Sequence, residues 1–214
     1  MVTWADLRTE IRYQLKDTAA TPRWPDAELQ TYVNYALADY SRYFPLQSSC
    51  VTGLAGDGST ILPEDYQVFA VEYPDDTFLP EISIKPGTRV WQGMRGWYQL
   101  EDKLWVLHPD SPSSVTVHFY TARGRIVNDT DVVDVPTADL ELIVLYVLAK
   151  CTERVGEQSA GLDRWRNQGQ RDDNPLVVMV NHYYERYRQG IFERLGGRSL
   201  TLSFGRRRHG YIHR

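Results

Sequence analysis

The residues of this chain that could carry chemistry are few and widely separated. Its two cysteines, Cys50 and Cys151, form no CxxC pair and stand beside no histidine, so neither a zinc site nor a disulfide framework is expected. The five histidines, at positions 108, 118, 182, 209 and 213, show no HExxH or other ligand-like spacing. The residue types and their spacing therefore predict no catalytic residue, no metal ligand and no cofactor.

Two segments superficially resemble binding loops, and a simpler structure is expected for each. Asp129, Asp131 and Asp134 could open a calcium loop, but the glycine and the terminal glutamate of such a loop are missing. We interpret these acids as a solvated linker that supplies N-caps ahead of a helix. The glycine-rich residues 53–58 lack the lysine and the following helix of a phosphate-binding loop, so a hairpin turn between two strands is expected there.

Charge is distributed unevenly along the 214 residues. Six of the 24 lysines and arginines lie between Arg194 and the end, where there is no acid, so the first 193 residues combine 18 basic with 28 acidic residues, a net charge of −10. An acidic body with a basic tail suggests contacts with acidic proteins or with nucleic-acid phosphates. The longest apolar run, residues 142–149, is too short to span a bilayer, and no signal peptide is recognised. An unexported protein of a reducing cytoplasm with no membrane partner is therefore expected.

The elements that must position these residues begin with two amphipathic helices. Thr3 fits an N-cap with Asp6 as the acid of a capping box, and apolar residues then recur at helical spacing over residues 4–15. A second apolar stripe follows Pro25 and is ended by Pro45. Because a short loop joins the two helices, they are expected to form a hairpin.

Between residues 47 and 125 the pattern becomes that of short strands. Runs rich in β-branched and aromatic residues lie at 50–52, 60–62, 68–73, 97–100, 103–107 and 115–120. In the last of these, Val115, Val117 and Phe119 alternate with more polar neighbours, as expected of a half-buried strand. Glu101-Asp102 fits a tight hairpin turn. An antiparallel sheet or small barrel, inserted into the helical part, is predicted.

Helical patterns return after residues 135–136. Residues 140–148 are apolar on nearly every side, which predicts a third helix buried all round. A polar stretch follows at 156–173, with a short helix expected near 162–165, and Asn174-Pro175 opens a fourth helix that Gly196-Gly197 ends.

The predicted fold class is α+β: a helical hairpin, an antiparallel β-sheet or barrel insertion, a second long helical hairpin and an extended C-terminal arm. The predicted domains are a discontinuous helical domain of residues 1–46 and 126–197, a β domain of residues 47–125 and a basic arm of residues 198–214.

Two sets of residues are candidates for binding other proteins. The arm alternates apolar and polar residues like a strand that could add to a sheet edge, and arginines follow it; a basic end without a fixed partner is the alternative. The arm candidates are Leu200, Leu202, Phe204, Arg206, Arg207, Arg208 and Arg214. The subunit-interface candidates are Tyr32, Tyr40, Tyr43, Tyr183, Tyr184 and Tyr187. Core packing between helices explains much of this aromatic stripe, and contacts between subunits are the alternative for the remainder.

Four parts of the chain carry a resemblance to a known family. They are the helical hairpin with TWADLR at 3–8 and RWPDAEL at 23–29, the segment TILPEDYQV at 60–68, the segment KLWVLHP at 103–109, and the long helix of 136–148. In order and texture they resemble the head-to-tail adaptor (connector) proteins of tailed bacteriophages, in particular the short-tailed-phage adaptors that carry a β insertion.

The resemblance implies a non-enzymatic structural protein of the virion neck, assembled in the host cytoplasm. Such an adaptor forms a homo-oligomeric ring of about twelve copies under the portal protein and joins it to a tail, nozzle or tail-completion protein. DNA passes through the ring without sequence-specific binding, the helices build the ring, and the C-terminal arm reaches towards the portal. The alternatives are a nucleic-acid-binding module acting through the arginine-rich tail, another neck or tail-completion protein, and a small hydrolase.

Overall fold

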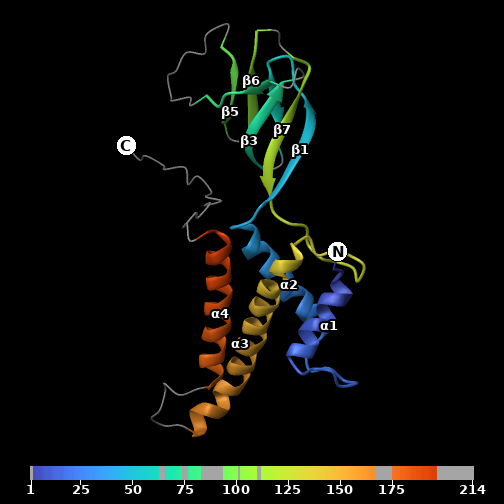
Figure 1. Ribbon diagram of the computed structural model, residues 1–214, viewed down its shortest axis with the longest axis vertical. Coiled ribbons are helices and arrows are strands. Elements are labelled where there is room, and N and C mark those ends of the chain that lie inside the picture. The colour runs from blue at the N-terminus through green and yellow to red at the C-terminus, as the bar shows by residue number, and fades with distance from the viewer. Residues whose placement is uncertain are drawn as a thin grey trace, which may run out of the picture. The chain divides into compact units, whose positions relative to one another are not determined.

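The chain folds into two compact units (Figure 1). The computed structural model describes residues 2–62, 66–73, 77–82, 94–100, 102–109, 112–166 and 175–196, with the backbone alone for residues 159–166. A helical unit comprises Met1–Phe44 and Arg123–Arg214, and a β unit comprises Pro45–Ala122. The part of the chain so described contains four α-helices and two antiparallel sheets, which confirms the predicted α+β class.

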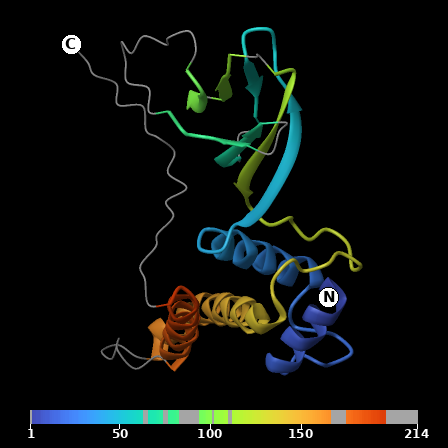
Figure 2. The same ribbon diagram turned by 45° about the horizontal axis from the view of Figure 1, so that its top comes forward.

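The helical unit is built around its longest helix, α3. The helices are α1 (Trp4–Gln14), α2 (Asp26–Ser41), α3 (Leu140–Arg166) and α4 (Pro175–Arg194), and a 3-10 turn, η1 (Thr137–Asp139), precedes α3. In Figures 1 and 2, α4 runs beside α3 on one side, and α2 and α1 lie on the other. Because α3 has neighbours on both sides, residues 142–149 are buried except for the half-buried Tyr146.

The first helix begins at the predicted capping box. The Thr3 hydroxyl accepts a hydrogen bond from the backbone N–H of Asp6, and the Asp6 carboxylate accepts one from the backbone N–H of Thr3 at 3.1 Å. These bonds satisfy two donors that the start of a helix otherwise leaves unpaired. Trp4, Leu7 and Ile11 then form the buried stripe of α1.

The third helix is longer than the sequence pattern predicted. The polar stretch from residue 156 was expected to interrupt it, with a separate short helix near residues 162–165, but α3 continues unbroken for 27 residues. Most residues of this stretch are good helix formers, and Gly156 and Gly161 each cost only about 1 kcal/mol relative to alanine. The separate short helix is therefore wrong. Residues 167–173 and Asn174, the predicted N-cap of the fourth helix, lie outside the described residues.

The β unit is a pair of antiparallel sheets packed face to face. Its strands are β1 (Leu46–Gly53), β2 (Ser59–Ile61), β3 (Gln67–Tyr73), β4 (Thr77–Leu79), β5 (Gly96–Leu100), β6 (Lys103–Leu107) and β7 (Ser114–Thr121). One sheet has the order β1-β7-β3-β4 and the other the order β2-β6-β5. Val71 and Val117 of the first sheet and Leu104 of the second belong to one buried cluster. No barrel closes among the described strands, so the sheet is the correct one of the two predicted alternatives.

The predicted turns have different outcomes. Leu100 pairs with Lys103, which confirms a tight β5–β6 hairpin at the predicted place, although Glu101 itself lies outside the described residues. The glycine-rich segment does turn, since the N–H of Ala55 donates to the carbonyl of Ser59 at 2.8 Å. The hairpin expected there is wrong, however, because β1 pairs with β7 and β2 pairs with β6. The strands β1 and β7 lie side by side (Figure 1) and pair over eight residues, which stabilises them more than a local pairing of β1 with the three-residue β2 would.

Candidate interaction surfaces

Two arginines of α1 tie the helical unit together near its N-terminus. Arg8 donates to Asp26 at 2.9 Å and to both carboxylate oxygens of Asp129 at 3.0 and 3.1 Å. Arg12 donates to the buried Asp17 at 2.8 Å and also binds Asp26. These charge-assisted bonds fix α1 to the start of α2 and to the linker that precedes α3.

The acidic linker has a different role from the predicted one. Asp131 accepts hydrogen bonds from the backbone N–H groups of Val127 and Asn128 at 2.7 and 2.8 Å, and these bonds lower the pKa of its carboxyl group. The residue that caps the turn before α3 is Pro136, which makes no side-chain bond to the helix. The predicted N-caps ahead of the third helix are therefore wrong. The acids instead close a turn of the linker and hold α1.

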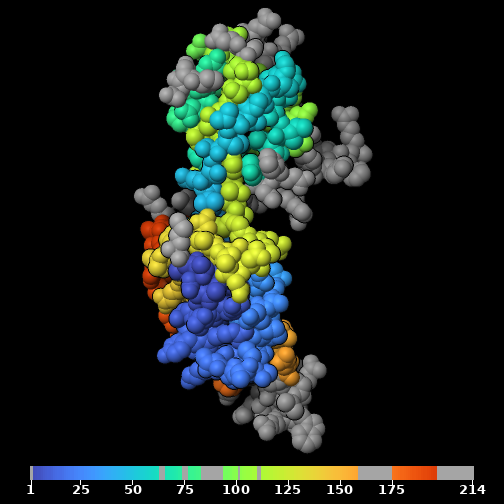
Figure 3. All heavy atoms as spheres, turned by 90° about the vertical axis from the view of Figure 1, so that its right-hand side faces the viewer, coloured from blue at the N-terminus to red at the C-terminus, as the bar shows by residue number. Residues whose placement is uncertain are grey.

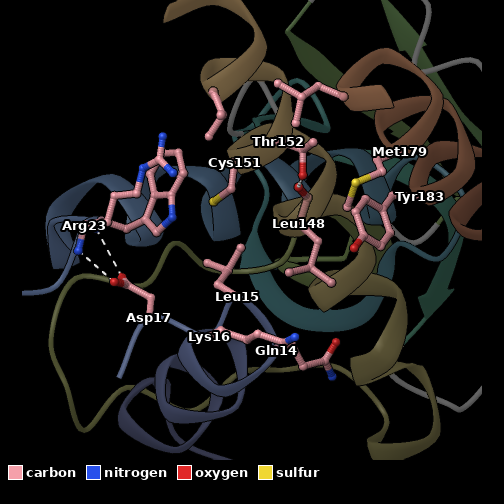
Figure 4. A pocket seen from close by; sticks show the side chains of 13 residues that line it. Gln14, Leu15, Lys16, Asp17, Arg23, Leu148, Cys151, Thr152, Met179 and Tyr183 are labelled. Carbon is pink, nitrogen blue, oxygen red and sulfur yellow. Dashed lines mark hydrogen bonds between the residues drawn. The ribbon is translucent and has the colours of Figure 1, made fainter. Parts of the chain in front are cut away.

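An open pocket of about 590 Å³ lies in the helical unit between the end of α1, the loop after it, α3 and α4 (Figure 4). Its lining comprises Gln14, Leu15, Lys16, Asp17, Arg23, Trp24, Leu148, Cys151, Thr152, Val155, Leu176, Met179 and Tyr183. Asp17 is occupied by structural bonds, because it accepts the backbone N–H groups of Arg23 and Trp24 at 2.7 and 3.1 Å. The pocket suits an apolar side chain better than a reacting substrate, since much of its lining is apolar and its carboxylate is already bound.

The cysteine of this pocket is a packing residue. Cys151 is fully buried, and burial, with a smaller contribution from Asp17, raises the pKa of its thiol to about 12. A thiol with this pKa stays protonated at neutral pH and is a poor nucleophile. Among the described residues that line the pocket, there is no histidine that could activate it.

The six interface tyrosines divide into two groups. Tyr40 and Tyr187 are 1% and 3% exposed and donate to Asp139 and Asp39. Burial, followed by these carboxylates, raises the pKa of both hydroxyls. These two tyrosines pack the interior of the helical unit and are not offered to a neighbouring subunit. The half-buried group consists of Tyr32, Tyr43, Tyr183 and Tyr184, and for these a subunit contact remains a prediction.

The outer surface of the four-stranded sheet carries a cluster of rings, here called the aromatic face: Phe69, Phe78, His118 and Tyr120. Phe69 is 41% and Phe78 61% exposed. The His118 ring lies 6.1 Å from that of Phe69 and 5.6 Å from that of Phe78, and the Tyr120 ring lies 4.5 Å from that of Phe69. The Nε2 atom of His118 is 2.8 Å from a carboxylate oxygen of Glu72. An aromatic sheet surface of this kind is typical of protein interfaces.

A β-bulge in β3 brings Phe69 to the aromatic face. The register of β3 on β7 shifts between Val68 and Ala70. Strict alternation would place Val68 and Val71 on opposite faces, but the extra residue lets both reach the core, at 8% and 0% exposure, and directs Phe69 outward. Sequence reasoning missed this surface. Its signal was the run of four apolar residues at 68–71, which is longer than the alternation of a half-buried strand allows.

The last described turn of α4 is fixed to the start of α3. Arg194 binds the Asp139 carboxylate and donates to the backbone carbonyl of Ala138 at 2.7 Å. The C-terminal end of α4, where the described residues stop, is therefore held in place by Arg194. The arm candidates, from Leu200 to Arg214, lie outside the described residues, so their contacts remain predictions.

No group of three or more histidines, cysteines or acids among the described residues is placed to hold a metal ion. None of the helices, as far as they are described, is long and apolar enough to cross a membrane.

A model of one protein family matches almost the whole of the described chain, including both units. This match defines the chain as a phage head–tail adaptor, a class of structural virion proteins. The chain belongs to the family described as SU10 adaptor protein, whose model matches residues 2–196. No curated protein matches the chain. The resemblance to phage adaptors expected from the sequence is thus confirmed.

Proposed function

We propose that this adaptor forms a closed homo-oligomeric ring that joins the portal protein to the tail and surrounds the DNA channel. The observation that carries the proposal is the family match over residues 2–196, which includes the helical unit and the β unit alike. A ring around DNA also agrees with the net charge of −10 in the first 193 residues. Acidic walls repel phosphates, so DNA slides past them instead of binding.

The two units offer separate surfaces for the two ends of such a joint. We assign the aromatic face of the β unit to a tail-side protein, because Phe78 and Phe69 are exposed there without any covering element in the described chain. We assign the C-terminal arm to the portal. Leu200, Leu202 and Phe204 supply the apolar side of an added strand, and the arginines after them supply bidentate contacts to acidic groups.

The assignment of the arm is tested by truncation after Gly196. The truncated chain is expected to fold, because the anchoring bonds of Arg194 to Asp139 and Ala138 are retained. It is also expected to lose binding to the portal protein of the same phage in a pull-down or by biolayer interferometry. Full affinity of the truncated chain for the portal would refute this role of the arm. Strong, salt-sensitive binding of the intact chain to DNA would favour the nucleic-acid alternative.

A further inference from the structure

One side of α4 is exposed along the length of the helix. Its residues recur at spacings of three and four, and both ends of the stripe are large and apolar. The stripe, here called the α4 face, consists of Val178, Asn181, Glu185, Arg188 and Phe192. Val178 is 60% and Phe192 53% exposed, and the adjacent Val177 is 54% exposed. A helix face that contacts only water is normally polar throughout, so this face has the composition of a contact surface.

The helices on the other side of α3, α1 and α2, each expose an aromatic residue. Tyr13 of α1 is 73% exposed and Tyr35 of α2 is 51% exposed. Figure 3 shows α1 and α2 next to each other, with α4 at the edge of the view. The surface, here called the α1–α2 face, consists of Asp6, Glu10 and Tyr13 on α1 and of Thr31, Tyr35 and Ala38 on α2, all of them exposed.

We infer that the α4 face of one copy packs against the α1–α2 face of the next copy. This inference rests on the proposed ring and identifies the surfaces that build it. The two faces differ in composition and lie on opposite sides of α3 (Figure 1), so the contact is head-to-tail. Every copy uses one face for each neighbour, and a contact of this kind closes into a ring when its rotation allows, whereas a self-complementary contact stops at two copies.

The positions of the helix ends determine which residues meet. The end of α1 and the start of α4 lie at the same end of the unit, because Leu15 and Lys16 line one pocket together with Leu176 and Met179. A rotation axis that runs roughly along the helices then places Tyr13 of one copy opposite Val178 of the next.

The other end of the contact is fixed in the same way. Asp139 binds both Tyr40, near the end of α2, and Arg194, at the end of α4. The same rotation therefore places Phe192 of one copy opposite the last turns of α2 in the next, where Tyr35 and Ala38 are exposed.

The charges of the two faces are complementary in part. Asp6 and Glu10 form ion pairs with no base, and Arg188 with no acid, among the described residues. The α1 side of the contact is thus acidic and can accept Arg188 of the neighbouring copy. Glu185 also lies on the α4 face, so the contact requires it to face the uncharged Thr31 and Tyr35 of α2 and not the acids of α1. Charges at the rim of an interface determine how the two copies are oriented more than they increase the affinity between them.

Cysteine cross-linking tests the inference directly. The variant Tyr13→Cys/Val178→Cys is made in a Cys50→Ser background, since Cys50 is only partly buried whereas Cys151 is fully buried. The complex assembled with the portal protein is treated with a short bis-maleimide. The expected product is a ladder of covalent multimers, while each single variant remains monomeric. The matched control is Tyr13→Cys/Phe192→Cys, which uses the same two faces at the wrong ends. Phe192 lies about 21 Å from Val178 along the helix, and little cross-linking is expected.

The outcomes separate this inference from the proposed function. A ring of normal mass that gives no ladder with the Tyr13→Cys/Val178→Cys variant would overturn the inference and leave the proposed function intact. Covalent dimers from a single variant would show a self-complementary contact and overturn it as well. If the unmodified chain forms no multi-copy complex, the proposed ring itself fails and the inference fails with it.

A charge introduced into the α4 face gives a second readout. Val178→Asp is expected to raise the concentration needed for assembly at least about tenfold. It should not unfold the chain, because Val178 is 60% exposed. Thr18→Asp, at an exposed loop position outside both faces, should leave assembly unchanged. Equal assembly of the two variants would contradict the inference.

Discussion

Replacing Gly58 with alanine should destabilise the β unit strongly. Gly58 has a φ of +79°, and a Cβ added to it would lie 2.7 Å from the backbone carbonyl oxygen of Val106. The left-handed conformation costs a residue with a Cβ roughly 1–2 kcal/mol, and forcing an atom into occupied space costs about 1–3 kcal/mol more. The obstructing atom is backbone, and Val106 also donates its N–H to the Gly58 carbonyl at 2.9 Å, so the strand cannot move away without losing that bond. The expected loss is about 2–5 kcal/mol, a large part of the ~5–15 kcal/mol typical of a folded domain.

The same turn contains a matched control. Gly56 has no positive φ, and a Cβ added there would meet nothing within 4 Å, so Gly56→Ala should be neutral or stabilise the β unit by up to about 1 kcal/mol. The assay is hydrogen exchange of β2 and β6 by mass spectrometry at increasing urea concentrations, which reports the opening free energy of these strands. If β2 and β6 are equally protected from hydrogen exchange in the Gly58→Ala and Gly56→Ala variants, the reasoning about this turn is refuted.

Three further predictions concern single side chains elsewhere in the two units. In the native chain a thiol reagent should modify the partly buried Cys50 and spare Cys151 until the chain unfolds, because burial raises the pKa of the Cys151 thiol to about 12. Equal rates of modification of the two cysteines would contradict this. Arg12→Met should destabilise the helical unit by about 1.5–3 kcal/mol, because the buried Asp17 carboxylate loses its ion pair and keeps the backbone N–H bonds of Arg23 and Trp24. The exposed Arg42→Met should cost under about 1 kcal/mol by urea unfolding. Similar losses would show that the Arg12 pair contributes little. The bonds of Asp131 to backbone N–H groups lower the pKa of its carboxyl group from the ordinary value of 3.8. The stability that this carboxylate contributes to the fold is therefore complete above pH 3.8 and is lost as the pH falls below it. Asp131→Asn should flatten the pH dependence of the free energy of unfolding in that acid range, and an unchanged profile would refute the assignment.

Local signals in the sequence were sufficient for much of the fold. The capping box at Thr3, the apolar stripe of α1 and the alternation of β7 each depend on neighbours within a few residues, and each has the predicted structure. The length of α3 was missed because the polar residues from Gly156 onward were expected to interrupt it, although most of those in the helix are good helix formers. The pairing of β1 with β7 was missed for a similar reason. It joins residues more than 60 positions apart, as in Gly53 with Ser114, and no local pattern specifies it.

The interaction surfaces were harder to predict than the fold. An aromatic stripe in a sequence does not distinguish a tyrosine that fills the core from one that faces a neighbour. Tyr40 and Tyr187 find carboxylate partners within the unit, whereas Tyr13 and Tyr35, which were not singled out, are exposed. The aromatic face includes Phe69, the extra residue of a bulge in β3, and the position of a bulge does not follow from a simple alternation of apolar and polar residues.

The central claim is that the chain is the ring-forming link between portal and tail. The most direct measurement is the mass of the complex formed when the purified chain is mixed with the portal protein of the same phage, by native mass spectrometry with electron microscopy of the same sample. A discrete complex carrying a closed ring of copies at the portal is the expected result. A portal that binds no copies, or single copies without a ring at saturating concentration, would contradict the account.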